Sequence, residues 1–171
     1  MRRILLALPV ALLALFLAAP AALAASPHFV SASAAFQGSG PNLNVSFKEA
    51  GLGNNQTITY LASADATATY ACINGGGNHP SAANKETVSG PVSAAGTFTS
   101  GKNGSISQTL TLFPPSAGSF ACPSGQKLTL AFVSYTMVQI EDTTNMLTES
   151  IPGTFSRCLV TGDLATELCP A

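Results

Sequence analysis

A chain of 171 residues with only 9% charged residues and a formal net charge of −1 lacks the clustered positive charge with which proteins bind nucleic acid. Its 46% hydrophobic content, arranged in repeated apolar and polar alternation, disfavours a disordered chain. The cations that follow the first 24 residues are scattered: Lys48, Lys85, Lys102, Lys127 and Arg157. We therefore expect no nucleic acid partner.

The first 24 residues have the parts of an export signal. Arg2 and Arg3 form a positive start, and an almost wholly apolar stretch follows over residues 4–23. Small residues at its end predict cleavage after Ala24 or Ala25. We expect secretion into the extracellular space, with no membrane span in the mature chain.

The remaining 147 residues (171 − 24) show the period-two alternation of an all-β fold. Leu43, Val45 and Phe47 alternate with polar residues and predict a half-buried strand, and the stretch 57–73, rich in Thr and Tyr, predicts another. Such segments recur about every ten residues, between turn-forming residues. The pattern predicts an antiparallel, immunoglobulin-like β-sandwich of about 7–9 strands over residues 25–155.

Glycine, proline and asparagine mark the connections in the first half of this domain. The stretch 75–80, Gly-Gly-Gly-Asn-His-Pro, predicts an exposed loop, because glycine loses much entropy in regular structure and proline lacks an amide donor. The stretch 86–93 contains a proline, which predicts an edge strand. The Asn-Gly pair within residues 101–104 predicts a tight hairpin that joins 97–99 to 105–107.

The second half predicts one long strand, two short ones and a tail. Residues 127–141 form the longest strand candidate, and because both of its faces are apolar we expect it centrally between layers. A turn is expected at 142–145, followed by one or two short strands over 146–155. A tail, 156–171, is expected to carry a brief helix near 163–168.

All four cysteines, Cys72, Cys122, Cys158 and Cys169, follow the leader, and an even number in an oxidising compartment predicts two disulfides. Three pairings are possible. We favour Cys72 with Cys122 and Cys158 with Cys169, since the second pair closes a short loop in the tail and leaves the first to join two central segments. No Cys-x-x-Cys or Cys-x-x-His spacing supports zinc, and neither a metal nor a cofactor is expected.

Several distinctive motifs follow residue 69: YACINGGGNHP at 70–80, ANKE at 83–86, SGPV at 89–92, GKNG at 101–104, CPSGQ at 122–126 and IPGTF at 151–155. Together they resemble an uncharacterised family of small exported bacterial proteins with no known activity. The resemblance covers roughly residues 43–155 and implies export and a β-domain, but no activity. Because the tail lies outside the shared part, the resemblance also supports pairing its two cysteines with each other.

The glycine loop is the candidate contact surface, and the residues expected to form it are Gly75, Gly76, Gly77, Asn78 and His79. A histidine on an exposed loop is a candidate base or ligand, but the spacing gives His79 no nucleophile and no partner that orients water. The glycine run also lacks the Gly-Lys-Ser/Thr ending of a phosphate-binding loop. An ordinary loop histidine is the favoured interpretation.

Paired carboxylates would indicate a glycosidase, which needs two of them roughly 5–10 Å apart. Glu141 and Asp142 are adjacent at a strand end, so we expect their side chains on opposite faces. Glu49, Glu86 or Glu149 could meet one of them in space, but the sequence does not select among these three. No calcium-loop pattern is present.

The favoured function is a secreted, non-catalytic, extracellular or envelope-associated binding or structural module whose ligand the sequence does not name. The first alternative is a secreted hydrolase, with His79 and Glu141 as its candidate residues. The second is a small-molecule carrier or enzyme inhibitor built on a β-sandwich. Because sandwiches serve many functions, the fold does not decide among these hypotheses.

Overall fold

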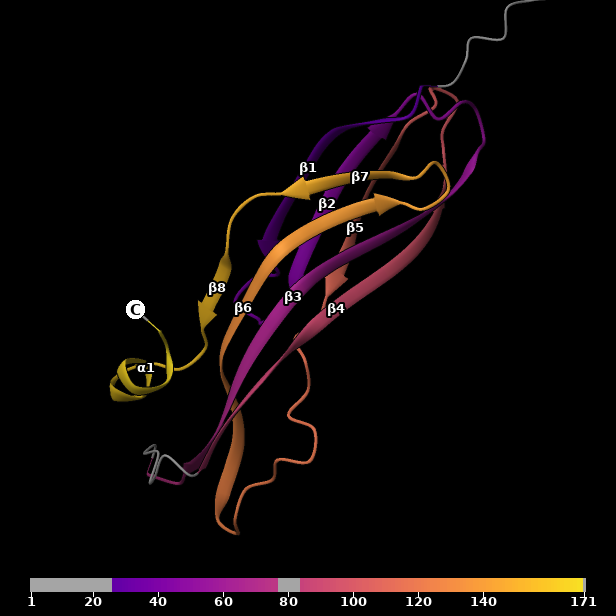
Figure 1. The fold of residues 1–171 in the computed structure, drawn as a ribbon. Helices are drawn as coiled ribbons and strands as arrows, with labels where there is room; N and C mark the ends of the chain where they lie inside the picture. Colours follow the sequence, from indigo (N-terminus) through magenta and orange to yellow (C-terminus); the bar gives the residue numbers. More distant parts are fainter. Residues whose placement is uncertain (1–25, 77–83, 171) are drawn as a thin grey trace, which may run out of the picture.

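The computed structural model describes residues 26–76 and 84–170, which form two antiparallel sheets and one short helix (Figure 1). The strands are β1 (His28–Phe36), β2 (Leu43–Ala50), β3 (Thr57–Asn74), β4 (Lys85–Thr99), β5 (Ile106–Leu112), β6 (Gln126–Asp142), β7 (Leu147–Ile151) and β8 (Phe155–Cys158), and the helix is α1 (Asp163–Leu168). The all-β fold and the tail helix are confirmed. The expected leader, 1–24, lies outside the described residues.

The strand order is that of an immunoglobulin-like sandwich. One sheet has the order β1-β2-β5 and the other has the order β4-β3-β6-β7, with β8 also pairing with β6. Lettered in chain order as A, B, C, C′, E, F and G, the first seven strands give A-B-E packed on C′-C-F-G. The eight strands lie within the predicted number.

The main core lies where the inner faces of the two sheets meet. Tyr60 of β3 is at its centre, with its ring 4.4 Å from that of Phe47, 6.1 Å from that of Phe98 and 6.5 Å from that of Phe29 between centroids. Such buried aromatic side chains each contribute roughly 1.5–3 kcal/mol of hydrophobic stabilisation. Aromatic rings therefore occupy the centre of the space between the sheets, and aliphatic side chains pack around them.

The Asn-Gly turn forms, but it does not close the predicted hairpin. Gly104 donates a backbone hydrogen bond to Gly101 at 2.9 Å, as in a tight turn, yet β4 pairs with β3 and β5 pairs with β2 in the other sheet. Buried Ser100 donates its amide to the Gln56 carbonyl and its hydroxyl to the Gly53 carbonyl. These contacts hold the turn on the loop between β2 and β3 and direct β5 into the opposite sheet.

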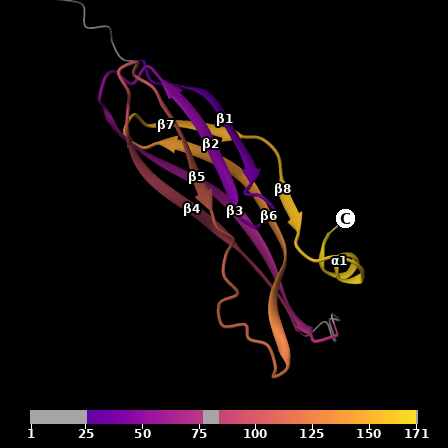
Figure 2. The same cartoon turned by 180° about the vertical axis from the view of Figure 1, so that it is seen from behind.

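Strands β3, β4 and β6 continue well past the end of the three-stranded sheet, as Figures 1 and 2 show. They have 18, 15 and 17 residues, against 9, 8 and 7 for β1, β2 and β5. The longest strand is therefore β3, and not the one predicted over 127–141. We call the extension, residues 67–74, 85–89 and 126–134, the arm.

One face of the arm is covered by the connection between β5 and β6. Cys72 of β3 is bonded to Cys122 of this connection. Two residues earlier on the same face, the Tyr70 hydroxyl donates to the Pro115 carbonyl at 2.8 Å. Burial raises the pKa of Tyr70, so the hydroxyl keeps its proton as a donor.

The opposite face of the arm is covered by the tail. Leu168 of α1 packs against Ala71 of β3 and Ala131 of β6 in a small second core. The tail is closed by the disulfide between Cys158 and Cys169. Both predicted disulfides are thus confirmed, and all four cysteines are bonded.

Gly96→Ala should destabilise the domain, because a Cβ there would lie 2.8 Å from the Phe98 ring and 2.9 Å from the Leu110 side chain in the main core. We expect the free energy of unfolding in urea to fall by about 1–3 kcal/mol. Gly90→Ala is the matched control in the same strand, since its Cβ would meet nothing within 4 Å. It should be neutral or stabilise by about 0.5 kcal/mol, and equal effects of the two substitutions would contradict this packing.

Replacing Cys72 and Cys122 together by alanine should cost up to about 4 kcal/mol, and replacing Cys158 and Cys169 together up to about 3 kcal/mol. The difference follows from sequence separations of 50 and 11 residues, because the longer loop restrains the unfolded chain more. Urea unfolding of the two double variants measures both costs. Limited proteolysis should cut the first variant within 113–125, and an unchanged cleavage pattern would show that the disulfide is not needed to hold this cover.

Candidate binding site at the end of the arm

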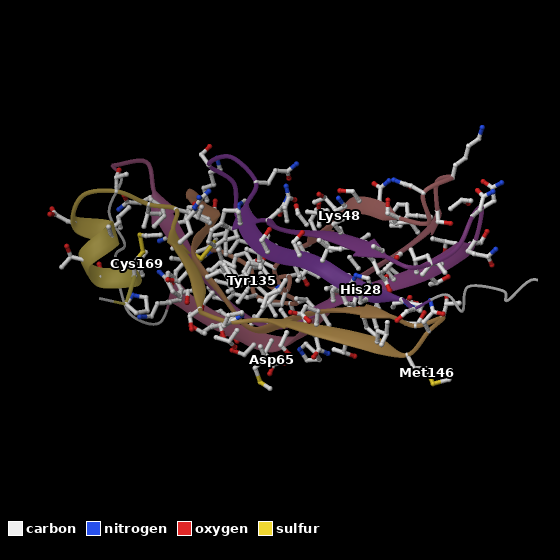
Figure 3. All side chains as sticks on the ribbon, turned by 90° about the horizontal axis from the view of Figure 1, so that it is seen from above. His28, Lys48, Asp65, Tyr135, Met146 and Cys169 are labelled. Atoms are coloured by element: carbon white, nitrogen blue, oxygen red, sulfur yellow. A yellow bond between two sulfur atoms is a disulfide. The ribbon has the colours of Figure 1, made fainter. Side chains whose placement is uncertain are left out.

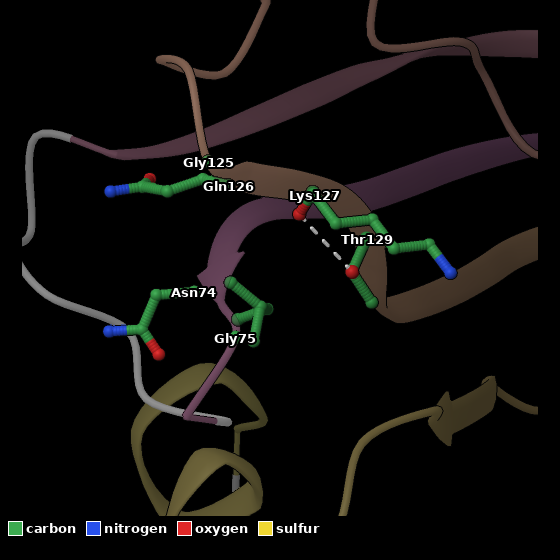
Figure 4. A pocket seen from close by; sticks show the side chains of 7 residues that line it. Asn74, Gly75, Gly125, Gln126, Lys127 and Thr129 are labelled. Atoms are coloured by element: carbon green, nitrogen blue, oxygen red, sulfur yellow. Dashed lines mark hydrogen bonds between the residues drawn. The ribbon is translucent and has the colours of Figure 1, made fainter.

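The free end of the arm carries an open hollow of about 390 Å³. Its walls are the end of β3 and the beginning of β6, which are neighbours in the sheet (Figure 4). The residues that line it are Ile73, Asn74, Gly75, Gly125, Gln126, Lys127 and Thr129. The hollow thus combines two amides, a hydroxyl, an ammonium group and one aliphatic side chain.

Local hydrogen bonds fix the backbone on both sides of the hollow. The Asn74 side-chain oxygen accepts the Gly76 amide at 3.0 Å, a turn that ends β3. The Gln126 amide donates to the Pro123 carbonyl at 3.1 Å and begins β6. The Asn84 amide group donates to the Gln126 side-chain oxygen at 3.3 Å, which joins the residue before β4 to the same site.

The described lining supplies hydrogen-bond donors and one positive charge, but no carboxylate, thiol or imidazole group. Lys127 is exposed and brings the ammonium group, while Ile73 brings apolar surface. General acid–base or nucleophilic catalysis needs a titrating or nucleophilic side chain close to the substrate. Among the described lining residues, only Lys127 and Thr129 carry such a group.

The structure describes only part of the predicted contact loop. Gly75 lines the hollow and Gly76 takes part in the turn beside it. Gly77, Asn78 and His79 lie outside the described residues, so their role stays a prediction. The candidate site thus includes the start of the predicted loop.

Sequence reasoning missed the other wall of the hollow, residues 125–129 of the β6 end. These residues lie fifty positions further along the chain, and no local pattern connects them to the glycine loop. The available signal was the predicted disulfide: Cys72 comes three residues before the loop, and Cys122 comes three residues before Gly125. That pairing places both segments at one end of the sheet.

One of the considered carboxyl pairs does meet, but inside the core. Glu49 and Asp142 are both 0% exposed, whereas the neighbouring Glu141 is half-buried and Glu86 and Glu149 are exposed. A buried pair cannot contact a polysaccharide, so Glu49 and Asp142 do not form a glycosidase site. Across 26–76 and 84–170, no three histidine, cysteine or acidic residues are arranged to hold a metal ion.

Comparison with known proteins gives no further guidance. No protein-family model, no curated protein and no solved structure matches the chain. The resemblance to small exported bacterial proteins stays a prediction. In the part of the chain that the structure describes, no helix is long and apolar enough to cross a membrane.

A second surface feature lies on the outer face of the five-stranded sheet. Met137 is 76% exposed and has a φ of +51° inside β6, where pairing changes from β8 to β7. It lines a small hollow of about 170 Å³ together with Asp65 and Pro91. Figure 3 shows Asp65 on the outside of the sheet and Tyr135 between the sheets. The β3–β6 register shifts here, between Ser63 and Asp65, and such a bulge redirects a side chain, here toward solvent.

Met137→Gly should leave stability unchanged or raise it by up to about 1 kcal/mol, because glycine adopts a positive φ without the strain of a side chain. Met137→Ala is the control that removes the side chain and keeps the strain, and it should be neutral. Thermal unfolding of both variants checks this. A loss of more than about 1 kcal/mol in the glycine variant alone would contradict the positive φ.

Proposed function

We propose that this chain is a secreted, non-catalytic binding module of the cell envelope or the extracellular space, and that it contacts its ligand with the free end of the arm. The observation that carries the proposal is the open hollow there, which has hydrogen-bond donors and one ammonium group but no carboxylate, thiol or imidazole group among its described residues. Two disulfides support an oxidising compartment.

The end of the arm suits binding because its backbone is fixed from two sides. The Cys72–Cys122 disulfide joins the two segments one residue before Ile73 and three residues before Gly125, and turns at Asn74 and Gln126 fix the strand ends. A site built on such rigid elements loses little entropy when it binds. The amides, the hydroxyl and Lys127 suit a hydrophilic ligand rich in hydroxyl groups and carrying some negative charge, such as an envelope polysaccharide.

The two alternatives have less support. A hydrolase would need accessible acid–base groups, and the carboxyl pair that the fold brings together is fully buried. A carrier would need space between the sheets, but the rings of Phe29, Phe47, Tyr60 and Phe98 occupy it. A binding module, in contrast, needs only chemical groups that the described site contains.

The test is retention of the purified mature protein on intact bacterial cells and on isolated wall polysaccharide. Lys127→Ala should weaken retention by at least about tenfold, since a hydrogen bond to a charged group is worth roughly 1.5–3 kcal/mol. Lys102→Ala is the matched control. It also removes an exposed lysine, but from the turn at the opposite end of the long strands.

Wild-type protein that is retained on neither material would overturn the envelope ligand. Equal retention of Lys127→Ala and Lys102→Ala would show that the ligand does not bind at the end of the arm. Release of soluble sugar from the polysaccharide by the wild-type protein, measured as new reducing ends, would favour the hydrolase instead.

A further inference from the structure

Two carboxyl groups, one from each sheet, meet in the main core beside Tyr60. Glu49 comes from β2 and Asp142 from the end of β6, and both are 0% exposed. Tyr60 of β3 lies directly opposite Asp142 in the sheet register, and its hydroxyl donates to Glu49 Oε2 at 2.7 Å. The three side chains therefore form a polar cluster that bridges the sandwich.

The two carboxyl groups differ in how well they are satisfied. Asp142 accepts three hydrogen bonds, from the amide of Thr144 and from the amide and side chain of Asn145, at 2.6 to 2.9 Å. Glu49 Oε1 has no donor among the described residues. The Asp142 carboxyl is close enough to Glu49 to raise the pKa of Glu49, and two ionised carboxylates offer only acceptors to each other.

We propose that Glu49 and Asp142 share one proton in the folded protein, which Glu49 Oε1 carries and donates to Asp142, and that this proton holds the two sheets together at acidic pH. Loss of the proton leaves two negative charges in contact between β2 and β6. The sandwich is thus a domain whose sheet packing weakens toward neutral pH.

The hydrogen bonds decide which residue carries the proton. The three donors around Asp142 stabilise a negative charge there, whereas Glu49 has only the Tyr60 hydroxyl. The pKa of Glu49 is raised from 4.5 to about 7, mainly by burial. The hydrogen bond from Tyr60 lowers this pKa, and the nearby Asp142 raises it further. Burial and Glu49 also raise the pKa of Tyr60, which stays a donor.

The other elements packed around Glu49 do not supply a strong counter-charge. From β1, His28 favours the ionised form of Glu49, but it is the smallest of the contributions, and its Nδ1 is hydrogen-bonded to the Ser26 carbonyl at 2.8 Å. From β5, the residue opposite Glu49 is apolar Ile106. The neighbouring Lys48 is exposed on the other face of β2.

The sign of the pH dependence follows from linkage. In the unfolded chain Glu49 loses its proton near pH 4.5, and in the folded domain near pH 7, so the proton's contribution is complete below pH 4.5. It is lost as the pH rises from 4.5 through 7, and it stays absent above that. Across this window the folding equilibrium constant should fall on the order of a hundredfold through this residue.

Glu49→Gln tests the proposal, because glutamine is a neutral side chain that donates to Asp142 and accepts from Tyr60 at every pH. Urea unfolding of the mature protein, with both disulfides intact, is measured from pH 4 to pH 9. The variant should lose the fall in stability between pH 4.5 and 7 and should be more stable than wild type at pH 8. Glu141→Gln removes the adjacent, half-buried carboxylate and should keep the wild-type profile.

Parallel pH profiles for wild type and Glu49→Gln would overturn the shared proton. So would a wild-type carboxyl titration, followed by NMR at Glu49, with its midpoint below pH 5. If calcium stabilises the wild type at pH 8 but does not stabilise Glu49→Gln, Glu49 Oε1 binds a cation instead of carrying a proton. If Glu49→Gln fails to fold, the NMR titration of the wild-type protein alone decides.

Discussion

The sheet of β4, β3 and β6 is longer than the sheet that packs against it, and this excess length determines much of the remaining structure. A sheet face that lacks a covering layer exposes apolar side chains to water. In the arm, both faces are covered by segments that have little regular structure: the connection 113–125 covers one face, and the tail with α1 covers the other. Each cover is short, and each is closed by one disulfide. The cysteines therefore replace part of the core that a third layer would otherwise provide.

The alternation of side chains predicted most of the strands, because successive side chains of a strand point to opposite faces wherever its neighbours lie. It could not predict how far the two sheets overlap. The Asn-Gly turn shows the same limit: Gly101 and Gly104 form the turn that their sequence predicts, but buried Ser100 decides which sheet receives β5. The local sequence thus determines the turn at 101–104, whereas long-range hydrogen bonds determine which strand β5 pairs with.

The buried carboxyl pair could have been predicted in part from the sequence. Glu49 has the same parity as Leu43, Val45 and Phe47, which places it on the buried face of β2. The same alternation places Asp142 on the side of β6 that holds Ile140. From the sequence, both residues were candidates for a catalytic carboxyl pair. Whether their side chains come together depends on how the two sheets pack. An acidic residue at a position where the alternation expects an apolar one indicates a buried polar contact. The sequence spacing alone does not identify the partner in that contact.

The candidate site and the carboxyl pair lie far apart along the same strand. Tyr60 and Asn74 are both in β3, fourteen residues and therefore about 45 Å apart. The contact between the sheets depends on a proton at the Tyr60 end, whereas disulfides fasten the covers at the other end, and a disulfide does not titrate. A change in pH therefore acts on the sandwich without acting on the groups that hold the arm. Binding at the arm and loosening of the sandwich are separable properties of one continuous sheet.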